Sequence, residues 1–172
     1  CQVAEQNERS FTVLYTNDEH GWMEGMGESN SAANLIQLWK DSEGYSATTA
    51  QDFLLLSGGD NWTGPAISTW NQGESMVEVM NSMGYAASAV GNHEFDYGED
   101  NLKNRLEQAE FEWVCANVNM SNSNVPQPNE YKTLNVGDLK VTFLGLVETN
   151  GKPNATIPST HPWKVQNFSF ER

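Results

Sequence analysis

The 172-residue sequence is poor in basic residues, with 9 lysines and arginines against 23 aspartates and glutamates. The formal net charge of −14 excludes the basic surface that nucleic-acid binding requires. The same charge repels an anionic ligand, unless bound cations reverse the sign locally. We therefore expect no nucleic-acid partner, and we expect cations at any site that takes an anion.

Cysteines and long apolar runs are also scarce. Two cysteines are too few for a disulfide framework, and no run of about 18 apolar residues exists to span a membrane. Cys115 lies in a strand-like run, which predicts a reduced core residue.

Cys1 opens the chain without a preceding Met, and the residues after it are polar up to Ser10. This arrangement is typical of a processed bacterial lipoprotein, in which the first residue carries the lipid. We therefore expect residues 1–10 to be a flexible leader, Cys1 to be the lipid attachment, and the location to be periplasmic or at the cell surface. The alternative to a lipoprotein is that cysteine is the first residue of this sequence by chance.

Alternating hydrophobic patterns predict an α/β layer structure in one domain, residues 11–172. Apolar and β-branched runs predict strands at 11–16, 53–56, 86–90, 113–117 and 165–170, and a hairpin of 131–136 with 140–147 around Gly137-Asp138. Helical spacing predicts helices at 31–42, 75–83 and 99–109. Gly84 is expected to cap the second helix, and its methionines are expected to fill the core.

Polar side chains follow the first three predicted strands directly. Asp18 and His20 are two positions apart in an extended segment, so both can face one cation. Asp60 follows two glycines, and its two oxygens can bridge two metals about 3.5–4 Å apart. Asn92 offers a neutral amide oxygen. Each residue alone would be an ordinary turn residue, but together they predict a site for two divalent ions, with Zn, Mn or Co suiting the mixed ligands.

His93 and Asp96 follow Asn92 in the same segment and predict acid–base chemistry beside the metals. Such a metal pair holds a phosphoryl oxygen and activates water for in-line attack. His93 can steady the transferring group or protonate the leaving oxygen, while Asp96 fixes its tautomer. Asn92 and His93 are thus expected to contact the substrate phosphate, whereas Glu94 and Phe95 are expected to hold the loop.

Three segments carry a family resemblance: Thr16–Gly21, Ser57–Asp60 and Met83–Gly98. They resemble the calcineurin-like metallophosphoesterases, in the branch of 5′-nucleotidases and UDP-sugar hydrolases. The resemblance implies the N-terminal portion of a four-layer α-β-β-α catalytic domain and the hydrolysis of nucleotide or nucleotide-sugar phosphoesters outside the cytoplasm. It also implies two divalent cations.

The resemblance implies a role for each matching residue. It assigns Asp18, His20 and Asp60 to the first metal, Asp60 and Asn92 to the second, and a catalytic dyad to His93 and Asp96. Glu19 stands where the family more often has an aliphatic residue, and it is expected to point away from the metals.

The sequence departs from the family in having no further histidine that could complete the site. The family continues with a Gly-His-x-His motif, whereas the third histidine here, His161, has neither carboxylates nor glycines around it. One alternative is therefore an incomplete fragment that binds metal weakly or assembles with a partner, including a dimer through an unfinished sheet edge. Another is a relative of the 2′,3′-cyclic-nucleotide phosphodiesterases, which share these motifs.

Overall fold

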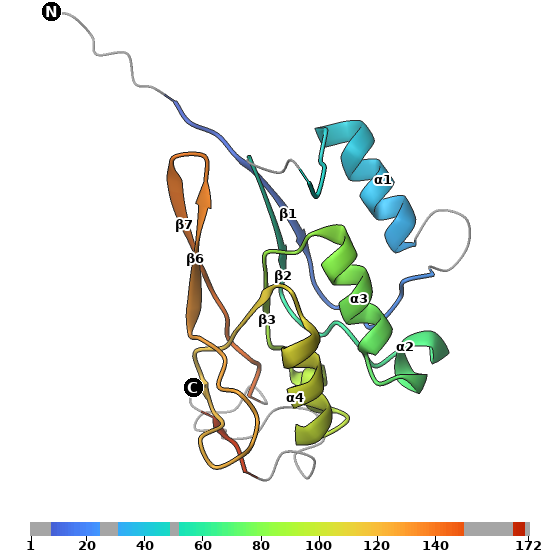
Figure 1. Cartoon of the computed structure of the whole chain (residues 1–172), viewed down its shortest axis with the longest axis vertical. Helices are drawn as coiled ribbons and strands as arrows, with labels where there is room; N and C mark the ends of the chain where they lie inside the picture. Colours follow the sequence, from blue (N-terminus) through green and yellow to red (C-terminus); the bar gives the residue numbers. More distant parts are fainter. Residues whose placement is uncertain (1–7, 25–30, 49–51, 150–166, 171–172) are drawn as a thin grey trace, which may run out of the picture.

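A computed structural model describes residues 8–24, 31–48, 52–149 and 167–170 (Figure 1). Strands and helices alternate in the first part: β1 (Thr12–Thr16), α1 (Ala32–Glu43), β2 (Phe53–Ser57), α2 (Ala66–Trp70), α3 (Glu74–Met83), β3 (Ala87–Ala89), the 3-10 turn η1 (Asn92–Phe95), α4 (Glu99–Gln108) and β4 (Glu112–Val114). The second part contains β5 (Val118–Asn119), β6 (Tyr131–Val136), β7 (Leu139–Leu144) and β8 (Ser169–Phe170).

The sheet that positions the site is parallel, and its strand order β1-β2-β3-β4 is the order of the sequence. Helices α1, α3 and α4 lie on one side of this sheet, and β6 and β7 lie on the other (Figure 1). Leu54, Leu55 and Leu56 of β2 are therefore all buried, as a strand covered on both faces requires. The parallel arrangement brings the carboxyl ends of the strands to one edge.

Glycines follow two of the helices, and the cap predicted at Gly84 is confirmed. Gly84 follows α3 with a φ of 85°, and Gly44 follows α1 with a φ of 71°. This left-handed conformation is readily adopted by glycine, which lacks a Cβ. Met76, Met80 and Met83 of α3 are buried in the core, so the prediction that these methionines fill it is confirmed.

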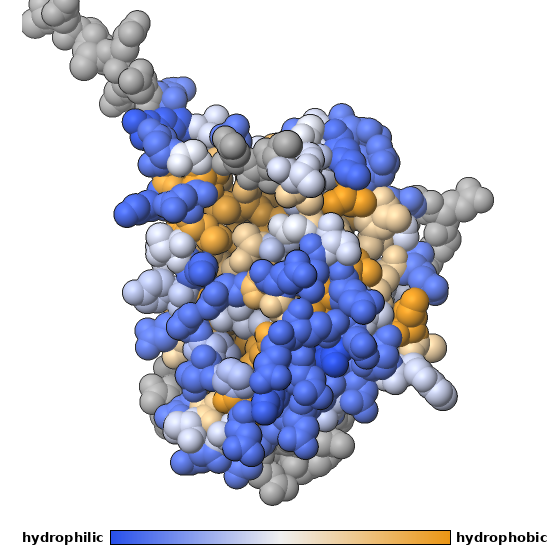
Figure 2. Space-filling view, viewed as in Figure 1, coloured by the Kyte–Doolittle hydropathy of each residue, from blue (hydrophilic) through white to orange (hydrophobic). Residues whose placement is uncertain are grey.

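The β6–β7 hairpin covers the second face of the parallel sheet. Its inward residues, including Val136 and Phe143, pack against Leu54, Leu56 and Ala87 in a separate apolar cluster. Figure 2 shows apolar residues between the hairpin and the sheet, and a hydrophilic surface over α4. The described residues thus form three layers: helices, parallel sheet and hairpin.

Several short elements were not predicted. Helix α2 has five residues and η1 has four, which is too short for a helical period to emerge. Strand β4 ends at Val114 because the next backbone amides, of Cys115 and Ala116, donate to the Asn129 and Gly145 carbonyls instead. The hairpin and the three longer helices match their predictions within a few residues.

Some sequence predictions fall outside the described residues. These include the lipid attachment at Cys1, most of the leader, His161 and the first part of the strand expected at 165–170. In the part of the chain that the structure describes, no helix combines the length and apolarity needed to cross a membrane.

Cys115 is a buried free thiol, as predicted, and burial raises its pKa to about 11. Because the folded pKa lies above the value of 9.0 for an unperturbed cysteine thiol, this thiol favours the fold below pH 9 and loses that contribution as the pH rises toward 11. In a Cys1→Ser variant, we expect Cys115 to react with a disulfide reagent at pH 8 about 100-fold more slowly in buffer than in urea. Equal rates under the two conditions would show that the thiol is accessible.

Candidate metal centre

The loops after β1, β2 and β3 meet at the carboxyl edge of the sheet. The Asp18 and His20 amides donate to the Gly59 and Asp60 carbonyls, at 3.1 and 2.9 Å. The third loop joins them where the His93 amide donates to Asp60 Oδ1 at 2.8 Å. Residues from three strand ends therefore lie against one another, as the sequence pattern predicts.

Two glycines permit this close approach of the loops after β2 and β3. A Cβ on Gly59 would lie 2.6 Å from the Gly91 nitrogen, and a Cβ on Gly91 would lie 2.3 Å from Asp60 Oδ1. Both distances are shorter than any normal carbon contact. Gly59 also has a φ of 99°, which other residues rarely adopt. Glycine is thus required at both Gly59 and Gly91 for this contact between the loops.

Strained backbone is concentrated at the same place. Four non-glycine residues here have positive φ: Asp18 at 54°, His20 at 47°, Asp60 at 56° and Thr63 at 77°. Aspartate tolerates this conformation, but a β-branched threonine adopts it rarely. Such strain is held in place by the surrounding structure and is found most often at functional sites.

Three side chains come together as potential metal ligands. One ligand atom each from His20, Asp60 and His93 lies within 4.8 Å of the other two. The two imidazole rings meet edge to face, with centroids 4.7 Å apart. Asp18 adds a carboxylate oxygen 3.8 Å from His20 Nε2. Imidazole nitrogens and carboxylate oxygens of this kind form a donor set that suits Zn, Mn or Co.

Hydrogen bonds orient both imidazoles. His20 Nδ1 lies 3.1 Å from the Thr63 carbonyl oxygen, which can only accept, so Nδ1 carries the proton and Nε2 is the nitrogen that could bind a cation. His93 Nδ1 lies 2.7 Å from Oδ2 of buried Asp96, which leaves Nε2 for other contacts. Burial lowers the pKa of His93. Its hydrogen bond with Asp96 and the charges of the nearby carboxylates raise this pKa by more than burial lowers it, so the net shift is upward.

The predicted residues on the third loop share the short turn η1 and its end. Asn92 begins η1 beside Gly91 and is half-buried, and Asp96 closes the turn. The structure thus brings Asp18, His20, Asp60 and His93 into one cluster and holds Asn92 and Asp96 on the same turn. It also places His93 close enough to share a ligand shell with His20, although the sequence suggested a role beside the metals.

Glu94 lies beneath the loops and is fully buried. Its carboxylate accepts backbone N–H groups from Asp60, Asn61 and Gly91, at 2.8, 2.7 and 2.5 Å. Burial raises the pKa of Glu94 to about 7. The prediction that Glu94 holds the loop is confirmed by these bonds.

Asn61 and Thr63 are site residues that the sequence reading missed. Asn61 is fully buried and connects Glu94 with Ser57 and Ser88 on neighbouring strands. The available signal was one serine in each of two otherwise apolar strands, Ser57 at the end of β2 and Ser88 in the middle of β3. Thr63 acts through its backbone carbonyl, which no residue pattern reveals.

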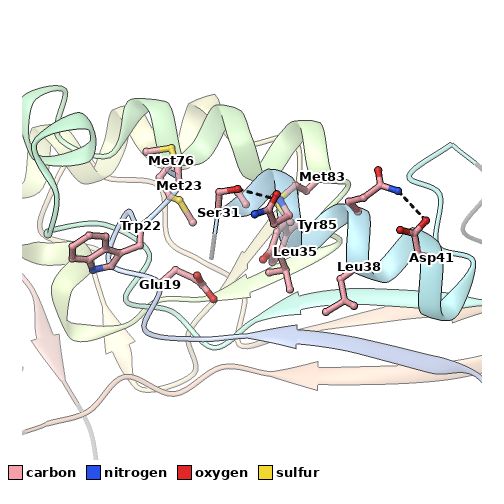
Figure 3. A pocket seen from close by; sticks show the side chains of 13 residues that line it. Glu19, Trp22, Met23, Ser31, Leu35, Leu38, Asp41, Met76, Met83 and Tyr85 are labelled. Carbon is pink, nitrogen blue, oxygen red and sulfur yellow. Dashed lines mark hydrogen bonds between the residues drawn. The ribbon is translucent and has the colours of Figure 1, made fainter. Parts of the chain in front are cut away.

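Glu19 faces a different part of the molecule. It lines a cavity of about 690 Å³ whose walls include Trp22, Leu35, Leu38 and Tyr85, and none of the potential metal ligands lines this cavity (Figure 3). Burial, followed by the charge of Asp18, raises the pKa of Glu19. This placement agrees with the expectation that Glu19 points away from the metals.

Comparison with known proteins gives relatives along most of the chain, although no family model matches it. The protein UshA of Yersinia enterocolitica is 33% identical over 148 residues, which is 84% of this chain and 27% of UshA. Among solved structures, a 5′-nucleotidase precursor of Thermus thermophilus aligns with a TM-score of 0.77 and 25% identity, over 93% of this chain and 31% of that one. The calcineurin-like phosphoesterase YfkN of Bacillus subtilis aligns with a TM-score of 0.57 and 25% identity, over 80% and 48%.

Fold and sequence together place the chain among the calcineurin-like metallophosphoesterases. Within that class it is homologous to the N-terminal part of the UshA and 5′-nucleotidase proteins. The chain spans about a quarter of the length of the curated relatives it matches.

Proposed function

We propose that this chain is the N-terminal part of the catalytic domain of a metal-dependent phosphoesterase that hydrolyses nucleotide phosphoesters. The observation that carries the proposal is the convergence of His20, Asp60 and His93 at the carboxyl edge of the sheet, with Asp18 beside them. Relatives named 5′-nucleotidase support the substrate class. Nucleotide monophosphates and nucleotide sugars are the proposed substrates.

The metal assignment follows the family resemblance, residue by residue. Asp18, His20 and Asp60 would hold the first divalent ion, and Asp60 with Asn92 would hold the second. Zn, Mn and Co all suit these ligands. When bound, such ions polarise a phosphoryl oxygen and acidify water.

The side chains of the third loop supply the remaining chemistry. His93 presents Nε2 because Asp96 holds Nδ1, so it can steady the transferring phosphoryl group or protonate the leaving oxygen. Asn92 lies next to it on η1 and can contact the same phosphate. In a protein of net charge −14, an imidazole whose pKa is raised is a suitable group to meet an anion.

A location outside the cytoplasm belongs to the same proposal, as the resemblance to the 5′-nucleotidase branch implies. A second candidate function is an incomplete piece that binds metal weakly or assembles with a partner. Two observations favour this second candidate: the chain has three histidines, fewer than a complete site of this family uses, and the chain covers about a quarter of the length of its relatives. In that case β1, which lies at one edge of the four-stranded sheet, is a strand with which a partner could pair. A 2′,3′-cyclic-nucleotide phosphodiesterase is the other alternative substrate class.

Assays of the 172-residue chain and of the full-length protein encoded by its gene separate these functions. With Mn, Co or Zn, and AMP, UDP-glucose or a 2′,3′-cyclic nucleotide, we expect turnover on the order of 10 s⁻¹ from the full-length protein. We expect little turnover from the 172-residue chain, because the downstream histidines are missing from it. Turnover of the chain alone at the full rate, lost in Asp60→Ala, would overturn the incomplete-site reading. A gene without a downstream Gly-His-x-His motif would count against the enzyme.

A further inference from the structure

The carboxylate of Glu94 binds backbone amides of both the loop after β2 and the loop after β3. Its Oε2 accepts the Asp60 and Gly91 amides at 2.8 and 2.5 Å, and its Oε1 accepts the Asn61 amide at 2.7 Å. Asp60 and Asn61 belong to the loop after β2, whereas Gly91 and Glu94 belong to the loop after β3. A single group therefore spans both loops.

These bonds form a closed ring around Asp60. Its amide donates to Glu94, its Oδ1 accepts the His93 amide at 2.8 Å, and His93 and Glu94 are neighbours in the chain. Asp60 is thus held at the backbone and at one carboxylate oxygen. This arrangement fixes the orientation of the carboxylate, one oxygen of which lies within 4.8 Å of a ring nitrogen of His20 and of His93.

A buried polar network anchors Glu94 in turn. Asn61 Nδ2 donates to Glu94 Oε1 and to Ser88 Oγ, each at 3.2 Å, and Ser57 Oγ donates to Asn61 Oδ1 at 2.7 Å. All four side chains are fully buried. The network connects the carboxylate to β2 through Ser57 and to β3 through Ser88.

The choice of a carboxylate is costly for stability alone. A buried carboxylate loses its hydration, and in the described part of the chain no lysine or arginine forms an ion pair with Glu94. Its partners are N–H donors that converge on two oxygens. A glutamine would offer one acceptor oxygen and turn an NH₂ group toward those donors.

We propose that Glu94 is a positioning residue of the metal centre, which sets the placement of Asp60 relative to His20 and His93. This inference rests on the proposed function, in which Asp60 serves both ions. Glu94 touches neither ion nor substrate, and it acts through the Asp60 backbone.

NMR and cobalt binding test this role on the 172-residue chain. Its three histidines give a simple imidazole spectrum, and the 4.7 Å separation of the His20 and His93 rings predicts nuclear Overhauser effects between them. We expect Glu94→Gln to lose these Overhauser effects. We also expect it to bind Co²⁺ about 10-fold more weakly, as measured by the visible absorption of the bound ion. Glu94→Asp keeps the charge and should recover part of both signals.

Met80→Ala is the matched control for a loss of stability alone, because Met80 of α3 is fully buried in the hydrophobic core. It should lower the melting temperature while keeping the ring contacts and the Co²⁺ affinity. Glu94→Gln with both the ring contacts and the Co²⁺ affinity intact, or Met80→Ala with both equally lost, would overturn the proposal.

If Glu94→Gln does not fold, Asn61→Ala offers a second test, because it removes one donor to the carboxylate. Unchanged ring contacts and Co²⁺ affinity in that variant would also overturn the proposal. A wild-type chain that shows the ring contacts but binds no Co²⁺ would contradict the proposed function, and the ring contacts would still decide the role of Glu94.

Discussion

Replacing Asp60 by asparagine is expected to weaken Co²⁺ or Zn²⁺ binding by more than about 100-fold, since even partners outside the ligand shell contribute 10–100-fold. Asp60 is the one carboxylate grouped with His20 and His93, and it is the ligand proposed to serve both ions. Asparagine keeps the oxygen that accepts the His93 amide, so the loops should stay in place. The substitution therefore removes charge from the centre while leaving its framework.

Metal titration by calorimetry or by Co²⁺ absorption measures this loss. Asp100→Asn is the matched control, because it makes the same change of charge at an exposed position in the first turn of α4. The control should bind metal as the wild type does. A similar affinity in Asp60→Asn and the wild type would contradict the assignment of Asp60 as a ligand.

The Gly59→Ala substitution is expected to lower the free energy of unfolding by about 3 kcal/mol, near the upper end of ordinary single substitutions. Two costs add at this position. The backbone φ of 99° disfavours any side chain, and the new Cβ would lie 2.6 Å from the Gly91 nitrogen. Backbone atoms cannot move aside as the end of a flexible side chain can, so the loops after β2 and β3 must separate.

Gly44→Ala separates these two costs. Gly44 also has a positive φ, of 71°, but a Cβ there would meet no heavy atom within 4 Å. Only the conformational cost remains, about 1 kcal/mol. Urea unfolding of both variants gives the comparison through the shift in midpoint. Equal losses at the two positions would mean that the contact between the loops contributes nothing.

The meeting of the three loops could be predicted from the sequence, because it requires only that the strands before them run parallel. Parallel strands end at one edge, so polar residues directly after three strands had to meet there. Asp18, His20, Asp60 and His93 meet for that reason. The alternation of strands and helices likewise needed only the period of the apolar residues.

The parts that escaped prediction depend on tertiary contacts or on elements too short for a period. Helix α2 and turn η1 belong to the second kind. The Thr63 carbonyl that orients His20 belongs to the first, because a backbone oxygen carries no sequence signal. Asn61 gives a similar example, since its importance comes from burial between two strands that the sequence cannot measure.

The sequential strand order β1-β2-β3-β4 has a consequence for how this protein is made. All residues that this chain contributes to the proposed centre precede position 97, and each strand pairs with the one synthesised just before it. The centre can therefore assemble as the nascent chain leaves the ribosome, at about 5–20 residues per second. By the time the hairpin of β6 and β7 emerges, the sheet edge that carries His20, Asp60 and His93 is already available, so folding on the ribosome proceeds from the site outward.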